Sequence, residues 1–334
     1  MEMIGQAHVS DADGTAIAWG EMGAGDPLVL LHGFQQSHRT WRRAAPPLAE
    51  SFHVLMPDLP GHGLSGRPDA PYTLTWYALK ISAWMDAIGV QRAHVCGHSF
   101  GGGIAQWMLL DHRRRVDRLG LVAPGGLGRE VGMGLRFATF PLLGRALTPF
   151  VIRYCLPFVV RHAPATFGYV EPEEVDQAAA MNRIPGTDRA FQRSVEGVIN
   201  LFGQHVRTMD RVREVASPPP IALFWGEHDS IIPVDHGHHA FKGSTGVTLT
   251  TYPESGHFPH LDVPFDFARD LRAFLRDPHR PPARMAQSDV GRRCSDITLG
   301  DVAPQTGYGP PGIRLALAVP SVHNGVRSSV LGDA

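Results

Sequence analysis

A serine that could act as a nucleophile lies in the pentapeptide Gly97-His98-Ser99-Phe100-Gly101, which has the pattern G-x-S-x-G. The apolar residues 93–96 before it are typical of a buried strand, and residues 99–112 have helical spacing. A serine on such a sharp turn has a strained backbone and an exposed hydroxyl, and the helix N-terminus favours developing negative charge. The pentapeptide alone would also suit a structural glycine-rich turn. With these flanks, the sequence predicts that Ser99 is a nucleophile.

A serine hydroxyl is a poor nucleophile at neutral pH, so it needs a base, and the base needs a carboxylate that orients it. Asp229 follows the apolar run at residues 221–225, and His257 follows the run at residues 247–252. Both residues therefore come after strands, in the chain order serine, acid, histidine. We predict Asp229 as the acid and His257 as the base.

Each of these two assignments has a competitor close by in the sequence. Glu227 could replace Asp229, but it lies closer to the end of its strand. His260 could replace His257, but it lies three residues further along the chain. The predicted set of catalytic residues is therefore Ser99, Asp229 and His257.

Acyl transfer also needs two preorganised donors for the oxyanion, and these are normally backbone N–H groups. One is expected from Phe100, directly after the nucleophile. The other is expected from Phe34, in the His32-Gly33-Phe34 segment that follows the apolar run at residues 28–31. His32-Gly33 by itself would also suit an ordinary turn at the end of a strand.

The elements that must position these residues follow an alternating pattern. Asp13-Gly14 lies between two short runs of alternating polarity, which predicts an antiparallel hairpin. Continuous apolar runs, typical of strands buried on both faces, then alternate with segments of helical spacing such as residues 72–89. This alternation predicts an α/β fold with a mostly parallel sheet, helices on both faces and functional loops at the carboxyl ends of the strands.

The alternation stops between about residues 125 and 214, where no strand-like run occurs and apolar helical stretches such as residues 135–160 stand instead. After residue 277 the chain becomes rich in proline and has little periodicity, which predicts a disordered tail. The short apolar run 315–319 could dock on the core. We therefore expect a first part of the core at residues 1–124, a helical cap at 125–214, a second part of the core at 215–276 and the tail at 277–334.

The composition excludes several classes of protein. The 334 residues have a formal net charge of −1, which gives no electrostatic reason to expect nucleic acid as a partner. The three cysteines, Cys96, Cys155 and Cys294, are widely spaced and odd in number, so we expect neither a disulfide framework nor a CxxC site. We find no secretory signal pattern and no long uninterrupted apolar stretch, and we expect a cytoplasmic protein without a membrane span. The oligomeric state stays open, with a homodimer as one option.

Three other patterns carry less weight. Residues 61–66 match G-x-G-x-x-G, but Arg67 and Pro68 that follow do not suit the helix of a dinucleotide site. The histidine-rich residues 235–239 lack the spacing of a metal site. The apolar residues 137–160 are expected to be broken into short pieces by arginines and by Pro141, Pro149 and Pro157. Cap helices lining an apolar pocket explain them best, with binding at a lipid interface as the alternative.

Together the chemical motifs resemble the α/β-hydrolase superfamily over residues 10 to 276. The segments that carry the resemblance are His32-Gly33-Phe34, Asp58-Leu59-Pro60-Gly61-His62-Gly63-Leu64-Ser65, residues 97–102, Gly226-Glu227-His228-Asp229 with Ile232-Pro233, and Gly256-His257. The resemblance implies an eight-stranded sheet with a cap inserted after the sixth strand. It also excludes haloalkane dehalogenases and epoxide hydrolases, because these need a carboxylate where Ser99 stands.

Within the superfamily, residues 123–128 and 234–237 are similar to the hydrolases that cleave carbon–carbon bonds in meta-cleavage products. Those enzymes usually have Trp after the catalytic histidine, where this chain has Phe258. They also use a cap arginine for the substrate carboxylate, and Arg183 and Arg189 are the candidates here.

We expect a serine hydrolase without cofactor or metal that acts on a small or medium apolar carbonyl substrate, most simply a carboxylic ester. Hydrolysis of a carbon–carbon bond in a diketone acid is the first alternative. A cofactor-free peroxidase-like activity, or a ligand-binding receptor that retains the triad, is an alternative of another class. Fold alone does not decide among these functions.

Overall fold

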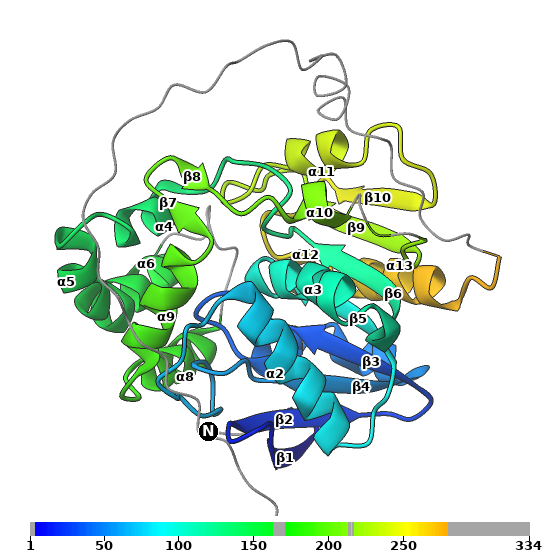
Figure 1. The fold of residues 1–334 in the computed structure, drawn as a ribbon, viewed down its shortest axis with the longest axis horizontal. Helices are drawn as coiled ribbons and strands as arrows, with labels where there is room; N and C mark the ends of the chain where they lie inside the picture. The colour runs from blue at the N-terminus through cyan, green and yellow to red at the C-terminus, as the bar shows by residue number, and fades with distance from the viewer. Residues whose placement is uncertain (1–3, 163–170, 213–214, 216, 280–334) are drawn as a thin grey trace, which may run out of the picture. The chain divides into compact units, whose positions relative to one another are not determined.

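The computed structural model describes residues 4–162, 171–212, 215 and 217–279. Its main element is an eight-stranded sheet in the order β1-β2-β4-β3-β5-β6-β9-β10 (Figure 1). β1 and β2 pair antiparallel, as do β2 and β4, and the other neighbours pair parallel. The strands are β1 (Gln6–Asp11), β2 (Ala16–Met22), β3 (Asp26–Leu31), β4 (Phe52–Pro57), β5 (Ala93–His98), β6 (Val116–Val122), β9 (Ile221–Gly226) and β10 (Val247–Tyr252). This is the predicted α/β-hydrolase sheet.

The hairpin between β1 and β2 forms at the predicted turn. Asp13 and Gly14 both have positive φ, 49° and 78°, and the N–H of Gly14 donates to Oδ1 of Asp11 at 2.8 Å. The polar turn residues thus supply the left-handed conformation that a tight connection between twisted strands requires.

Alternate side chains of the central strands pack on opposite faces of the sheet. Val29 and Leu31 of β3 belong to one core with α2 and α3, whereas Leu28 and Leu30 belong to the other core with α1 and α13. Figure 1 shows α2 and α3 in front of the sheet and α13 behind it. Both faces are covered, which explains the continuous apolar runs. The core helices are η1 (His38–Trp41), α1 (Ala45–Ala49), α2 (Leu74–Ala87), α3 (Phe100–Asp111), η2 (Arg113–Arg115), α11 (Asp235–Ala240), α12 (Pro259–Asp262) and α13 (Pro264–Arg276).

The segment inserted between β6 and β9 is mainly helical. It also contains a two-residue antiparallel pairing, which corrects the expectation that no strand occurs there. This pairing is too short to produce an apolar periodicity that the sequence could reveal. The inserted elements are α4 (Met133–Ala138), α5 (Leu143–Phe150), the π-helical η3 (Val151–Cys155), α6 (Leu156–His162), α8 (Pro172–Asn182), α9 (Thr187–Glu196), β7 (Ile199–Asn200), β8 (Gly203–Gln204) and α10 (Thr208–Val212).

The expectation that prolines break residues 137–160 into short pieces is wrong for the later part. Leu143–His162 is one helical run of 20 residues, although Pro149 and Pro157 lie within it. A proline lacks an N–H and crowds the preceding turn, so it normally breaks a helix. Here a wider π turn lies between the two prolines, and it lets the helix continue past them. By length and composition, this run could cross a membrane: its mean hydropathy is 1.3, and 17% of it is buried.

The tail predicted at residues 277–334, with its run 315–319, lies outside the described residues from residue 280 on.

The loop after β4 is built around the buried carboxylate of Asp58. Its Oδ1 accepts from the N–H of His38 at 2.7 Å and contacts Nδ1 of the same residue at 2.8 Å, and its Oδ2 accepts from the N–H of Leu64. Burial would raise the pKa of Asp58, but the hydrogen bonds from His38 and Leu64 and the proximity of His38 and His32 lower it overall. The N–H of Leu59 in turn donates to Nε2 of His32. The glycine-rich residues 61–66 thus form a structural turn beside β3.

We predict that Gly63→Ala will destabilise the protein much more than Gly89→Ala. Both glycines have positive φ, 50° and 76°. A Cβ at Gly63 would lie 2.1 Å from Oδ2 of Asp58, whereas a Cβ at Gly89 would have no atom within 4 Å. Gly89→Ala, the control, should lose about 1 kcal/mol of unfolding free energy through backbone strain. Gly63→Ala should lose about 2 kcal/mol more, because its Cβ would also displace the Asp58 carboxylate. Urea unfolding measures both, and equal losses would contradict the role given to Asp58.

Candidate active site

Ser99 stands at the turn between β5 and α3 with a strained backbone, φ 53° and ψ −113°. Its N–H donates to the carbonyl oxygen of Val122 on the neighbouring β6 at 2.9 Å, and its carbonyl accepts from the N–H of Gly125 at 3.0 Å. A Cβ at Gly97 would lie 2.3 Å from the carbonyl oxygen of Gly101, so the turn can close only with glycine there. The predicted strained serine turn is therefore present.

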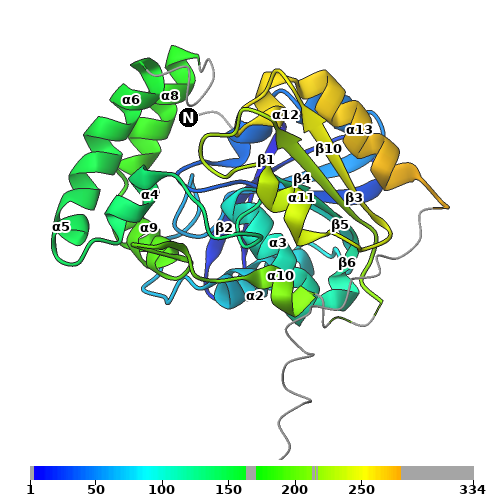
Figure 2. The same cartoon turned by 90° about the horizontal axis from the view of Figure 1, so that it is seen from above.

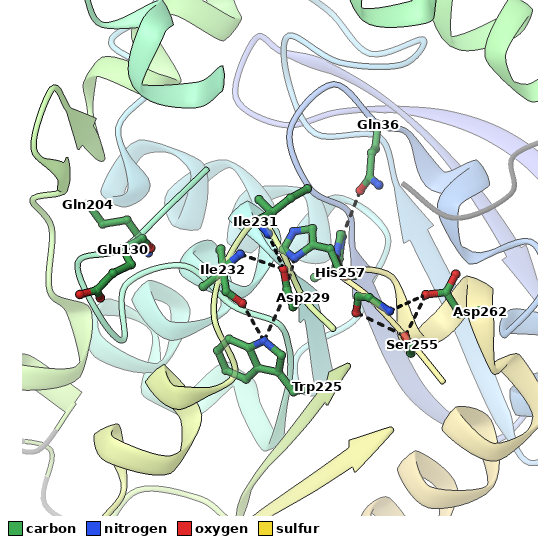
Figure 3. Close-up of polar contacts among 12 residues, drawn as sticks. Gln36, Glu130, Gln204, Trp225, Asp229, Ile231, Ile232, Ser255, His257 and Asp262 are labelled. Carbon is green, nitrogen blue, oxygen red and sulfur yellow. Dashed lines mark hydrogen bonds and ion pairs between the residues drawn. The ribbon is translucent and has the colours of Figure 1, made fainter. Parts of the chain in front are cut away.

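The loops after β9 and β10 bring Asp229 and His257 together (Figure 3). Nδ1 of His257 lies 2.7 Å from Oδ2 of Asp229. The same oxygen accepts from Nε1 of Trp225 at 3.1 Å, and Oδ1 accepts from the N–H groups of Ile231 and Ile232, each at 2.8 Å. Three donors thus hold a buried carboxylate as the acceptor for Nδ1–H of His257, which leaves Nε2 of His257 to take up a proton.

The two competitors lie elsewhere. Glu227 is exposed, and its carboxylate accepts from Oγ1 of Thr251 at 2.8 Å. His260 is fully buried, and its Nε2 lies 2.8 Å from Oγ1 of Thr40. Burial and the neighbouring His257 hold the pKa of His260 well below its usual range, so this residue is a neutral part of the core.

The loop that carries His257 has its own carboxylate. Oδ2 of Asp262 accepts from Oγ of Ser255 at 2.8 Å and from the N–H of Gly256 at 3.1 Å (Figure 3). Burial raises the pKa of Asp262 despite these bonds. Asp262 therefore fixes the backbone directly before His257.

His98 and Gln36 were not predicted as site residues. Nε2 of His98 donates to the carbonyl oxygen of His257 at 2.9 Å, and its ring lies 4.8 Å from that of His257. Nδ1 of His98 lies 3.1 Å from Oε1 of Gln36, and this oxygen accepts from the N–H of Gly33 at 2.8 Å. Burial and the neighbouring His260 and His257 lower the pKa of His98 well below its usual range. His98 occupies an x position of G-x-S-x-G, where the pattern gives no signal for its role.

The two residues proposed to stabilise an oxyanion flank Ser99. The rings of Phe34 and Phe100 stack with their centroids 4.0 Å apart, and both residues line a small pocket together with Ser99. Phe100 is the first residue of α3, so its N–H has no acceptor within the helix. Gln35, after Phe34, has φ 55°, which turns the chain sharply beside the serine.

A larger cavity of about 680 Å³ lies between the inserted helices and the loops of the core. Ser99 and His257 line its core side, and most of its other lining side chains are apolar, including Ile152, Leu156 and Phe191. This is the size and polarity of a site for a small organic molecule.

The charged residues at the cavity are paired. Arg39 and Arg42 line it, and they form ion pairs with Glu174 and Glu171. The two arginines suggested for a substrate carboxylate are placed differently. Arg183 lies over the ring of Tyr154 at 5.9 Å, and Arg189 donates to the carbonyl oxygen of Arg67. Neither lines the cavity.

Among the described residues, no group of three or more histidine, cysteine, aspartate or glutamate side chains is arranged to hold a metal ion. In the histidine-rich segment, Nε2 of His236 contacts Glu130 at 2.7 Å, and Nδ1 of His239 donates to the carbonyl oxygen of Asp235. Cys96 is buried in β5, and burial raises the pKa of its thiol. These groups stabilise the core and helix α11.

Comparison with known proteins agrees with this fold and geometry. Residues 26–264 match the family model described as alpha/beta hydrolase fold, so the chain belongs to that family and is a hydrolase of this superfamily. It is 37% identical over 269 residues to 2-hydroxymuconate semialdehyde hydrolase of Pseudomonas sp. strain CF600, with 77% of this chain and 89% of the relative covered. It is 30% identical over 265 residues to an uncharacterized protein of Mycobacterium tuberculosis, with 76% of each covered.

A solved structure is similar as well. The meta-cleavage product hydrolase of Pseudomonas fluorescens IP01 superimposes with a TM-score of 0.64 at 23% identity, covering 80% of this chain and 97% of that one. At this identity the likeness shows the fold alone. The family-model match confirms the predicted superfamily, and the solved structure agrees with the predicted fold.

The buried histidines predict a loss of stability in mild acid. Burial lowers the pKa of His32 to about 4 and that of His62 to about 3, and it also holds His98 and His260 neutral. Unfolded histidine titrates near pH 6.5, so below that pH the unfolded state binds more protons than the folded state. The unfolding free energy should therefore fall by about 1.4 kcal/mol per pH unit for each of these histidines between pH 6 and 5.

Urea unfolding at several pH values measures this slope. In His62→Gln, the slope of unfolding free energy against pH should be smaller than in the wild type by about 1.4 kcal/mol per pH unit, because one buried histidine is removed. This difference in slope does not depend on how much the substitution changes the stability itself. Stability that does not change between pH 6.5 and 5 would contradict the neutral, buried state of these rings.

Proposed function

We propose that the protein is a serine hydrolase that cleaves small or medium apolar carboxylic esters through an acyl-enzyme. The observation that carries the proposal is the 2.7 Å contact between Asp229 and His257, at the wall of the same cavity that the strained Ser99 lines. A nucleophile, a base and an acid at one cavity are the set that acyl transfer needs.

In the first half of the proposed reaction, Nε2 of His257 removes the proton of Ser99 as its oxygen attacks the carbonyl carbon. The backbone N–H groups of Phe34 and Phe100 hold the oxyanion. Asp229 fixes the histidine tautomer and stabilises the imidazolium, which then gives its proton to the leaving alcohol. In the second half, water loses a proton to His257 and attacks the acyl carbon. The bond to the Ser99 oxygen then breaks as His257 returns the proton to that oxygen, which releases the acid and restores the free enzyme.

The cavity supports an apolar substrate. Its wall on the side of the inserted helices is largely aliphatic and aromatic, and the arginines at its edge are already paired with glutamates. A substrate carboxylate would have to displace Glu171 or Glu174 to bind there. A neutral ester binds without that competition.

Carbon–carbon bond hydrolysis of a meta-cleavage-type diketone acid is the second candidate. The 37% identity to 2-hydroxymuconate semialdehyde hydrolase favours it. The positions of Arg183 and Arg189 outside the cavity weigh against it. A peroxidase-like enzyme or a receptor that retains the triad has no specific observation in its favour.

Initial rates on short chromogenic acyl esters test the proposal. We expect turnover by the purified protein and a loss of at least about a thousandfold in Ser99→Ala, because the nucleophile is removed. A dienoic diketone acid, assayed beside the esters, measures the second candidate. Turnover of the diketone acid without turnover of any ester would overturn the ester assignment, and full activity of Ser99→Ala would overturn nucleophilic catalysis.

A further inference from the structure

The outer face of the helical run Leu143–His162 is apolar and exposed. Five side chains spaced three or four residues apart form a stripe along it, each 39% to 64% exposed: Leu143, Leu147, Phe150, Tyr154 and Phe158. Figures 1 and 2 both show α5 and α6 at the outer side of the inserted helices, away from the sheet. Such a stripe is unusual on a soluble surface and marks a site of interaction.

The inner face of the same helix is also apolar, because Ile152, Leu156 and Val160 line the catalytic cavity. Two partly exposed residues also line the cavity. They are Phe137 of the neighbouring helix α4, 39% exposed, and Val159 of α6, 41% exposed. Apolar surface therefore continues from the outer stripe to the wall of the cavity.

The charged residues near the stripe indicate which kind of partner binds it. Residues 131–170 contain four arginines and no aspartate or glutamate. Arg145 forms a two-point ion pair with Glu196 on α9, whose carboxylate also accepts from Nε2 of Gln192. Arg161 pairs with Asp176 on α8, and this ion pair is largely exposed and therefore weak. The guanidinium group of Arg161 can exchange its carboxylate for a phosphate at little cost.

A second copy of the chain fits this face less well. In a two-fold dimer the same patch would face itself and bring the arginines of both copies together. A lipid surface with anionic headgroups offers an apolar layer for the stripe and phosphates for the arginines, which is the pattern of a helix lying in a membrane interface. If the helix Leu143–His162 crossed a membrane instead, its inner face would have to leave the cavity that it lines.

We propose that the stripe Leu143–Leu147–Phe150–Tyr154–Phe158 docks the protein flat on an anionic lipid surface. Docking does not depend on the ester chemistry. Given the proposed function, it would also let apolar substrates pass from the lipid into the cavity along Phe137 and Val159.

Vesicle co-sedimentation tests the docking. Wild-type protein should bind phosphatidylcholine vesicles that contain phosphatidylglycerol, and bind phosphatidylcholine alone more weakly, since each arginine near an anionic surface adds about fivefold. Phe150→Glu with Phe158→Glu should weaken binding by about tenfold for each substitution. The matched control is Val9→Glu with Phe265→Glu, two similarly exposed apolar residues on β1 and α13, which should bind as the wild type does.

Other readouts separate this proposal from the enzymatic one. Ser99→Ala should bind vesicles as the wild type does, and the double Phe variant should keep its melting temperature and its turnover of a soluble ester. Absence of binding to either vesicle would overturn the proposal, as would equal binding by the double Phe variant. Equally strong binding to neutral vesicles would contradict the role of the arginines. A dimer that the double Phe variant converts to monomer, without vesicle binding, would assign the stripe to a second copy.

Discussion

The positive φ of Ser99 is the constraint on which the site depends. An L-residue does not hold this conformation unaided, and here the backbone bonds to Val122 and Gly125 fix it from the end of β6. The close approach of Gly97 to Gly101 lets α3 begin at once after the serine. The strain therefore places a hydroxyl at the carboxyl edge of the sheet, beside the loops that follow β9 and β10.

The surroundings keep His257 in one orientation. His257 is held through its ring by Asp229, through its main chain by His98, and through the preceding loop by Asp262. The neighbouring ring of His98 is neutral because it is buried, so it can pack against His257 without the repulsion of a second charge. The polar groups around His257 thus serve to position it, and the cavity wall opposite is left apolar.

Much of the fold could be predicted because its signals are local. The buried strands are continuous apolar runs, and Ser99, Asp229 and His257 lie at or within a few residues of the ends of strands that meet at one edge. Other features depend on tertiary contacts. His98 and Gln36 gain their roles only when β5, the loop after β3 and the loop after β10 come together. The sequence patterns contain no information about such hydrogen bonds between segments that are far apart in the sequence.

The inserted helices were the least predictable part. Pro149 and Pro157 indicated breaks, but the π turn between them lets the helix continue. Arg183 and Arg189 were suggested from sequence position alone. In the structure Arg183 contacts Tyr154, Arg189 contacts Arg67, and neither lines the cavity. Insertions pack against a scaffold through irregular contacts, so periodicity decides little there.

The rate at which a fluorophosphonate labels Ser99, followed by intact-protein and peptide mass spectrometry, tests the central claim most directly. If Asp229 orients His257 to activate Ser99, Asp229→Asn should slow labelling by about ten-thousandfold. Glu227→Gln, the matched change at the neighbouring carboxylate, should leave the rate unchanged. Labelling at a different residue, or equal rates in Asp229→Asn and Glu227→Gln, would contradict the account.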